Sequence, residues 1–374
     1  MSAAGMNMSP NPRPAPAWWR APAANESSTF HQLSPYIGKL KSTIARDLVT
    51  RFSKPNDLVL DPFAGAGTIP LECMLLGRRS FAADISPYAR VLCCAKMAPP
   101  ASLDAALRRI QSVAGPSNEF LVDELPRPPI WVRRFFHPHT LRDVLRFATT
   151  CRQRKDDFLL ACLLGILHHQ RPGFLSYPSS HLVPYLRDKK FPRSAYPELY
   201  AYRPLLPRLE AKARRTYRRP AFLASPGKFV QSGIETLAFP RDVDAIITSP
   251  PYMNALDYGR DNRLRLWFIQ PQPAPPEDPP ATRRRADFLC AMTALARKAD
   301  AHLRKRGHCI LVVGENVTRN ANLHPTDVVR DVFSAHAPSL RLVSVIVDSI
   351  PDIRRARRDC TGTKQENVLV YRKR

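Results

Sequence analysis

The sequence has 374 residues, 44% of them hydrophobic, which is enough for one large catalytic domain with an insertion or for two modest domains. Its eight cysteines include no CxxC pair, and its longest apolar run, residues 159–167, is too short to span a bilayer; both features argue against a zinc ribbon, a disulfide framework and a membrane protein. The formal net charge of +25 excludes no function by itself, but a polyanionic partner such as nucleic acid is the simplest reason to tolerate it. A GC-rich genome would also enrich Arg, Ala and Pro, so the charge alone favours nucleic acid only modestly. We expect a soluble cytoplasmic protein.

Strand and helix patterns alternate in the first third of the chain. Residues 1–29 are rich in Pro, Ala, Ser and Asn and predict a disordered lead-in, although Trp18 and Trp19 have the character of docking residues. The expected elements then follow in the order helix 39–53, strand 57–61, helix 68–77, strand 80–84 and helix 86–97. This order predicts an α/β fold, a Rossmann-like parallel sheet with helices on both faces.

The pattern changes between residues 101 and 227, which we interpret as an insertion that is helical first and irregular from 172 onwards. Residues 126–225 carry twenty Lys and Arg against six Asp and Glu, with tyrosines interleaved. Arg214, Arg215, Arg218 and Arg219 lie in its densest basic stretch. Target recognition on nucleic acid is the favoured interpretation, and a solvated helical cap is the alternative.

The strand pattern resumes after the insertion. We expect strands at 229–231, 243–248, 308–314, 340–347 and 367–372, and a helix at 286–305. The last two strands are joined by a loop too short for a crossover helix, so they should form an antiparallel hairpin. The predicted organisation is therefore a disordered segment 1–29, a cofactor-binding half 30–100, an insertion 101–227 and a catalytic half 228–374.

Residues 61–68, with the sequence DPFAGAGT, connect the first expected strand to its helix. Such turns bind ligands at the carboxyl ends of parallel strands, and Gly65 and Gly67 allow a close backbone approach. The segment has neither the GxGxxG pattern nor the lysine of a P-loop. Asp61 can accept a hydrogen bond from an ammonium group, and Asp84, at the end of the second strand, can accept from ribose hydroxyls. The pair predicts a site for adenosine that carries an amino-acid tail.

Ser249, Pro250, Pro251 and Tyr252 follow the buried strand 243–248, which places them at the same sheet edge as the turn. An exocyclic amine of a base is a poor nucleophile because its lone pair is delocalised. The Ser249 hydroxyl and the Pro250 carbonyl can accept its N–H groups and localise that lone pair, while the prolines fix the backbone. Tyr252 can stack on the base. The four residues are therefore candidate catalytic residues for direct methyl transfer.

These motifs resemble those of the S-adenosylmethionine-dependent amino-methyltransferases of DNA. Residues 61–68 are similar to motif I at every fixed position, and Ser249–Tyr252 is similar to motif IV. The resemblance implies that S-adenosylmethionine is the cofactor and that motif I residues, Phe63 and Thr68 included, bind it. It extends to residues 31–40, similar to motif X, where Tyr36 and Lys39 are candidate cofactor contacts, and to Asp84, the motif II acid. Residues 230–234 lack the aspartate that the family often has in motif III.

The resemblance further implies methylation of a base in DNA, double-stranded as in such enzymes, after the base is flipped from the helix. Family members with Ser before Pro-Pro-Tyr mostly act on cytosine N4, and those with Asp or Asn mostly on adenine N6. A site-specific cytosine-N4 methyltransferase is thus the favoured prediction. Adenine N6, guanine N2 of RNA, and an inactive nucleic-acid-binding regulator remain alternatives. Nucleic-acid contacts are predicted at Arg260 and Arg263, after motif IV, and at Arg354, Arg355, Arg357 and Arg358, in the loop before the last strand.

Overall fold

A computed structural model describes residues 10–20, 27–114, 125–169, 173–178, 188–220, 222–251, 253, 258–272, 281–315, 324–349 and 365–374. Among these residues, no helix is both long enough and apolar enough to cross a membrane.

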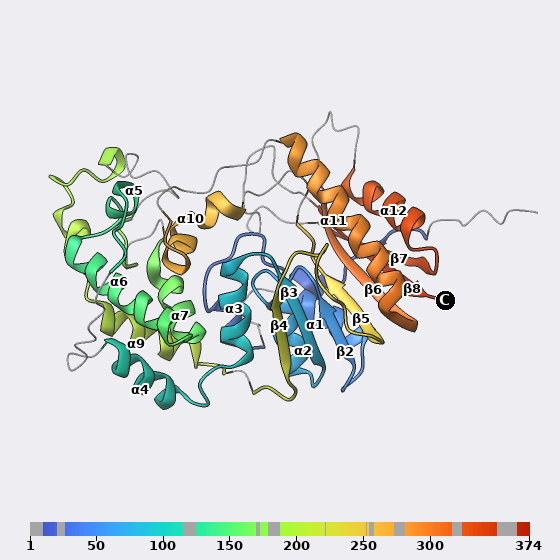
Figure 1. The fold of residues 1–374 in the computed structure, drawn as a ribbon, viewed down its shortest axis with the longest axis horizontal. Coiled ribbons are helices and arrows are strands. Elements are labelled where there is room, and N and C mark those ends of the chain that lie inside the picture. Colours follow the sequence, from blue (N-terminus) through green and yellow to red (C-terminus); the bar gives the residue numbers. More distant parts are fainter. Residues whose placement is uncertain are drawn as a thin grey trace, which may run out of the picture.

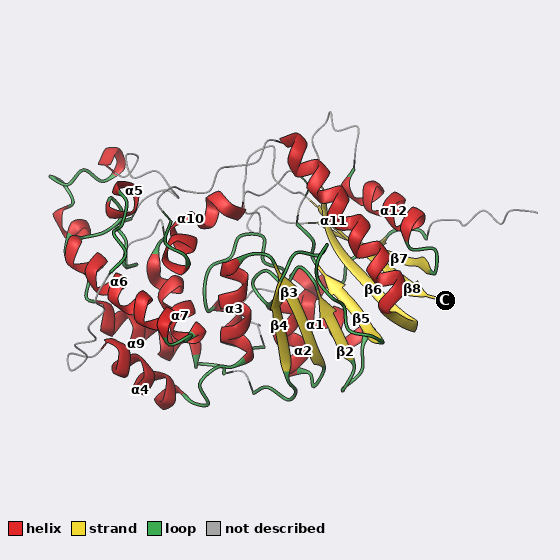
Figure 2. Ribbon diagram, in the orientation of Figure 1, coloured by secondary structure: helices red, strands yellow, loops and turns green. Residues whose placement is uncertain are grey.

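The described chain contains an eight-stranded sheet in the order β1-β7-β8-β6-β5-β2-β3-β4 (Figures 1 and 2). The strands are β1 (Arg13–Pro14), β2 (Leu58–Asp61), β3 (Arg79–Asp84), β4 (Gly227–Gln231), β5 (Val243–Thr248), β6 (Leu303–Glu315), β7 (Leu340–Ser349) and β8 (Gln365–Lys373). Strand β8 runs antiparallel to both of its neighbours, β6 and β7, whereas the other neighbouring pairs are parallel. The predicted α/β fold, a Rossmann-like sheet with a C-terminal antiparallel hairpin, is confirmed.

Helices cover both faces of the sheet because each strand alternates its side chains between them. In β2, Val59 packs on the face covered by α1 (Ser42–Phe52) and α2 (Thr68–Leu75), and α3 (Pro87–Met97) also lies on that side. The next residue, Leu60, packs on the other face with α11 (Ala281–His302) and α12 (Pro325–His336). Two apolar layers therefore sandwich the sheet.

The insertion forms a helical lobe beside α3 (Figure 1). Its described α-helices are α4 (Leu103–Ala114), α5 (Ile130–Arg133), α6 (Pro138–Gln153), α7 (Asp157–Leu167) and α9 (Leu205–Thr216). All residues of α7 from Phe158 to Leu167 are buried, and its core is continuous with that of α3 and of α10 (Tyr258–Ile269). The mostly helical insertion is thus packed firmly against the sheet domain.

Two expectations from the sequence need correction. Residues 172–226 are not irregular throughout, because α9 buries Leu205, Leu209 and Ala213 at helical spacing. The lead-in 1–29 is ordered over residues 10–20 and 27–29. There β1 extends the sheet beside β7, and the buried Trp19 donates its indole N–H to Asp47 at 2.9 Å. Composition alone did not reveal that one edge strand and one buried indole anchor this segment.

Gly165 of α7 is where the insertion meets the segment 27–41 most closely. An added Cβ would overlap the backbone carbonyl oxygen of Leu33 and lie 3.0 Å from Lys212 Cε. The overlap with the Leu33 backbone is hard to relieve, so Gly165→Ala is expected to lower the free energy of unfolding by about 1–3 kcal/mol. Chemical denaturation measures this loss, and an unchanged midpoint would contradict the close packing.

Candidate active site

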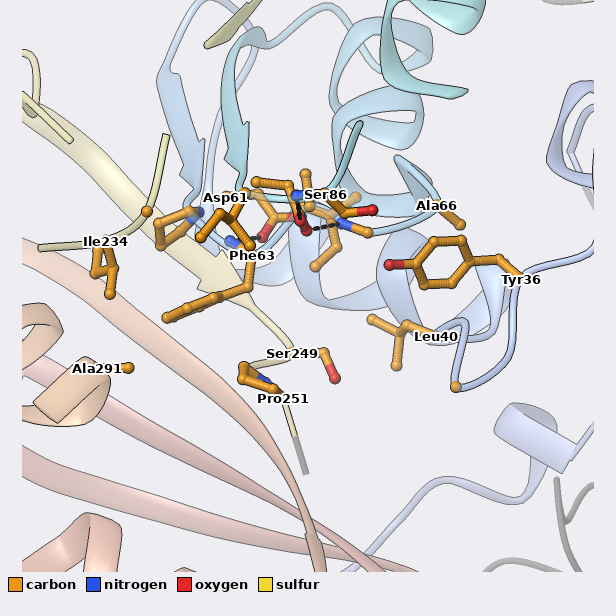
Figure 3. A pocket seen from close by; sticks show the side chains of 18 of the residues that line it. Tyr36, Leu40, Asp61, Phe63, Ala66, Ser86, Ile234, Ser249, Pro251 and Ala291 are labelled. Atoms are coloured by element: carbon orange, nitrogen blue, oxygen red, sulfur yellow. Dashed lines mark hydrogen bonds between the residues drawn. The ribbon is translucent and has the colours of Figure 1, made fainter. Parts of the chain in front are cut away.

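A cavity of about 510 Å³ lies at the carboxyl ends of β2, β3, β4 and β5. Both predicted motifs line it, since Asp61, Phe63 and Gly65 face it from one side and Ser249 and Pro251 from another (Figure 3). The two loops meet because β2 and β5 are adjacent parallel strands whose carboxyl ends share one edge of the sheet. This arrangement satisfies the geometric requirement for transfer of a group between ligands held by the two loops.

The glycine-rich turn has a backbone that L-residues with side chains rarely adopt. Gly65 and Gly67 have φ of 46° and 69°. An added Cβ on Gly67 would lie 2.9 Å from Cys93 Sγ of α3, so this glycine allows helix packing and does not line the cavity. The Gly65 N–H donates to Asp84 Oδ2 at 2.8 Å, which joins the turn to the end of β3. The turn is thus prearranged before any ligand arrives.

Asp61 is buried at the base of the cavity and is only 2% exposed. Its Oδ1 accepts hydrogen bonds from Thr248 Oγ1 at 2.6 Å and from the Phe63 N–H at 3.3 Å. Burial raises the pKa of Asp61 to about 7, and no cationic side chain of the described residues offsets that effect. An ammonium group bound beside this carboxylate would offset it. Thr248 therefore links the two motifs directly, a role that the sequence reasoning did not identify.

The raised pKa of Asp61 predicts a pH-dependent cofactor affinity. Between pH 3.8 and about 7 the folded, ligand-free protein binds a proton at Asp61 that the unfolded chain does not. The contribution of this group to stability is therefore fully present below pH 3.8 and is lost progressively as the pH rises to about 7. A bound ammonium favours the carboxylate and expels the proton. Cofactor affinity should thus rise by up to about tenfold from pH 5.5 to 6.5 and level off near 7.

Titration calorimetry across this range measures the slope, with Asp61→Asn as the control that has no proton to lose. The same slope in Asp61→Asn would assign the pH dependence to another group.

Further polar groups fit a cofactor with an amino-acid tail. Thr68 Oγ1 is buried and has no hydrogen-bond partner among the described residues, although Thr68 lines the cavity. Tyr36 stacks on Tyr88 with ring centroids 5.6 Å apart and lines the cavity beside Gly65. Lys39 also lines it, but its Nζ donates to the His31 carbonyl at 2.8 Å, which fixes the segment 31–40. The Asp61 carboxylate can accept from the ammonium group of such a tail, and the buried Thr68 hydroxyl can donate to its carboxylate.

The far end of the cavity contains the groups suited to a nucleoside. Asp84 uses its carboxylate to accept the Gly65 and Ser86 N–H groups, both at 2.8 Å, and burial raises its pKa. Ile85 lines the cavity with its side chain 74% exposed, an apolar surface for a base. Glu235, after β4, also lines it. Residues 230–234, which correspond to motif III, have no aspartate. Glu235, the next residue, supplies a carboxylate to the cavity, and motif comparison did not identify it.

The catalytic loop presents the Ser249 oxygen to the cavity (Figure 3). Its hydroxyl donates to the Val312 carbonyl of β6 at 3.4 Å, which directs the proton away and leaves lone pairs to accept from a substrate N–H. Pro250 is buried and is not among the residues that line the cavity, whereas Pro251 lines it opposite Phe63. Tyr252 lies outside the described residues.

The predicted nucleic-acid contacts fall into three places. Arg214, Arg215, Arg218 and Arg219 are exposed in the helical lobe, in α9 and just after it. Between them, Tyr217 donates its hydroxyl to the Pro100 carbonyl, beyond the end of α3 that lies away from the cavity. Arg260 and Arg263 lie on α10, whose Gly259 lines the cavity. Arg354, Arg355, Arg357 and Arg358 lie outside the described residues. The strand ends that flank them, Ser349 and Gln365, pair at the cavity edge.

Comparison with known proteins supports the resemblance seen in the motifs. Residues 8–92 match a family described as DNA methylase. Over 58 residues the chain is 36% identical to Type II methyltransferase M.MjaII of Methanocaldococcus jannaschii, a match that covers 16% of this chain and 11% of that protein. The chain thus aligns with about a tenth of its curated relative. The predicted resemblance to the amino-methyltransferases and the predicted cofactor, S-adenosylmethionine, are confirmed.

Solved structures of methyltransferases are also similar in outline. An rRNA methylase from Streptococcus thermophilus is 9% identical, with 88% of this chain and 95% of that chain covered and a TM-score of 0.32. The glycopeptide N-methyltransferase MtfA, solved with S-adenosyl-L-methionine, is 10% identical, with 88% and 86% covered and a TM-score of 0.31. At these scores the likenesses carry no inference about the substrate of this chain.

Proposed function

We propose that this chain, which carries the cofactor-binding region of the DNA amino-methyltransferase family, methylates the exocyclic 4-amino group of cytosine in DNA. The observation that carries the proposal is the shared cavity. Asp61 and Ser249 line one space, and the Thr248–Asp61 hydrogen bond holds their two loops together. A methyl donor on the first loop and an amine on the second therefore lie within one enclosure.

The cofactor, when bound, supplies an electrophilic methyl group on a sulfonium. The residues of the chain hold the amine for an in-line displacement. Ser249 Oγ would accept one amine N–H while its own proton points to Val312. The Pro250 carbonyl is proposed as the second acceptor from its place in the motif. These acceptors would localise the nitrogen lone pair for attack on that methyl group. As the C–N bond formed and the C–S bond broke, the amine would lose a proton to solvent, with the demethylated cofactor as the leaving group. Positioning supplies most of the rate.

Ser249 favours cytosine over adenine in this proposal. In the family, Ser in this position is mostly associated with cytosine N4, while Asp or Asn is mostly associated with adenine N6. Adenine-N6 methylation is the alternative, because the description of the matched family, DNA methylase, does not specify the base. A base inside a duplex cannot enter the cavity, so the substrate base is extruded or already single-stranded. The net charge of +25 suits a polyanionic substrate.

The proposal is tested with purified protein and cofactor labelled on the methyl group. Parallel reactions contain duplex DNA, single-stranded DNA or tRNA, and digested nucleosides are separated by mass spectrometry. Labelled N4-methylcytosine from DNA is the expected product. N6-methyladenine from DNA would move the assignment to the alternative, and label in tRNA alone would replace DNA as the substrate. No label in any substrate, with normal cofactor binding, would indicate an inactive nucleic-acid-binding protein.

A further inference from the structure

The insertion contains a second cavity of about 580 Å³ that plays no part in holding the cofactor. Its lining is rich in basic and aromatic residues, among them Arg133, Arg134, Arg193, Phe136, Tyr177 and Tyr200. Three of these residues are arginines, and none of the described lining residues is acidic. We refer to this cavity as the arginine hollow. A concave surface of this composition is suited to an anion.

The three arginines of the hollow are exposed, and one of them is positioned by an aromatic ring. Arg133, Arg134 and Arg193 are all exposed, and neither Arg133 nor Arg193 forms an ion pair with a carboxylate of the described residues. The Arg193 guanidinium lies 4.7 Å from the ring centroid of Tyr200, and that ring packs 5.0 Å from Tyr177. A guanidinium held over an aromatic ring can still present N–H groups for a planar, bidentate contact with phosphate.

Tyr200 is itself held in place by burial and by its hydroxyl contacts. It is only 7% exposed, and its hydroxyl donates to the Phe191 carbonyl at 2.5 Å and lies 3.4 Å from Asp188 Oδ1. The platform under Arg193 therefore does not need to order when a ligand binds, which reduces the entropic cost of binding.

Helix α10 connects the hollow to the active site. Gly259, near its first turn, lines the active-site cavity, and Phe268, near its end, packs against Phe136 of the hollow with ring centroids 5.8 Å apart. Between them, Arg263 lies 5.3 Å from the ring of Trp131 in α5. Nine residues of helix separate the two ends by about 14 Å. That is about four steps of a nucleic-acid strand at roughly 3.4 Å each.

We propose that the arginine hollow binds backbone phosphates of the nucleic-acid substrate a few nucleotides from the base that enters the active site. The inference rests on the proposed function and deepens it. It places the phosphate grip at Arg133, Arg134 and Arg193, which are connected to the active site through α10. It does not place it at Arg214, Arg215 and Arg218, the densest basic stretch of the sequence, which lies around the end of α9, near Pro100 and away from the active-site cavity.

The test compares two variants with the same change in charge. One is the hollow triple variant Arg133→Gln, Arg134→Gln, Arg193→Gln, and the matched control is Arg214→Gln, Arg215→Gln, Arg218→Gln. Binding of a fluorescent duplex and of a single strand is measured from 50 to 400 mM salt by anisotropy. Cofactor affinity by calorimetry and thermal melting show that each variant is folded.

The hollow variant is expected to lose about 10- to 100-fold in nucleic-acid affinity at low salt and to lower the salt slope by up to about 3, with unchanged cofactor affinity. The control is expected to change affinity by less than about threefold. Arg193→Gln alone should lower the slope by about 1. If the melting temperature of the triple hollow variant is lowered, the salt slope of the Arg193→Gln single variant, whose change lies on the surface, tests the inference instead.

Equal losses in the two triple variants would overturn the inference, because the whole charge and not the hollow would then attract nucleic acid. So would normal affinity in the hollow variant. The failure of the proposed function looks different. If wild-type protein binds DNA through the hollow but transfers no methyl group, the proposed methyltransferase activity is refuted and the phosphate site is still supported. Wild-type protein that binds no nucleic acid would refute both.

Discussion

Ser249→Ala is expected to reduce methyl transfer by about 100- to 1000-fold while the cofactor dissociation constant stays within about twofold. The hydroxyl lines the cavity and directs its proton to the Val312 carbonyl, so its lone pairs are available to the substrate amine. Alanine removes that acceptor without disturbing the cofactor turn. The acceptor works mainly as the nitrogen becomes tetrahedral, so the loss should appear in kcat rather than in substrate affinity.

Single-turnover kinetics with labelled cofactor measure the first of these quantities, and calorimetry the second. Ser232→Ala is the matched control, because Ser232 is another serine that lines the same cavity, at its nucleoside end. That control should keep nearly normal turnover at saturating cofactor. If Ser249→Ala turned over at the wild-type rate, the catalytic role assigned to this hydroxyl would be wrong.

Asp84→Ala is expected to raise the cofactor dissociation constant by about 10- to 100-fold while turnover at saturating cofactor is largely kept. The carboxylate has two tasks. It accepts the N–H groups of Gly65 and Ser86 at 2.8 Å, which fixes the turn, and it lines the cavity where ribose hydroxyls are expected. Its loss leaves both N–H groups without their acceptor and removes the ribose contact.

Asp84→Asn separates the two tasks, because the amide oxygen can still accept one N–H but lacks the charge. Its affinity should fall between those of wild type and Asp84→Ala. Asp287→Ala provides the control for removing a carboxylate from the same cavity, on α11 and away from the turn. An Asp84→Ala protein that binds cofactor normally would show that neither contact contributes to affinity.

The order of strands β2 to β8, the two motifs and their meeting place could be predicted from the sequence, whereas β1 and helices α9, α10 and α12 were not. Parallel strands carry their carboxyl ends to one edge, so motif I after β2 and Ser249 after β5 were expected to meet there from strand order alone. The short link before the last strand similarly allowed only an antiparallel partner. Such inferences succeed because they depend on the side-chain periodicity of strands (two residues) and helices (3.6 residues), and on whether a connecting segment is long enough for a crossover helix.

Only the tertiary structure decided which side chains act at that edge. Thr248 contacts Asp61 across 187 positions of sequence, and Glu235 reaches the cavity from a loop that matches no motif. The arginines around position 215 were predicted to bind nucleic acid because of their density in the sequence, yet they lie around the end of α9, near Pro100 and away from the cavity. Arg193, by contrast, is positioned over the ring of Tyr200. Composition records how much charge a chain carries. The direction of each side chain depends on packing between distant segments, which no local pattern encodes.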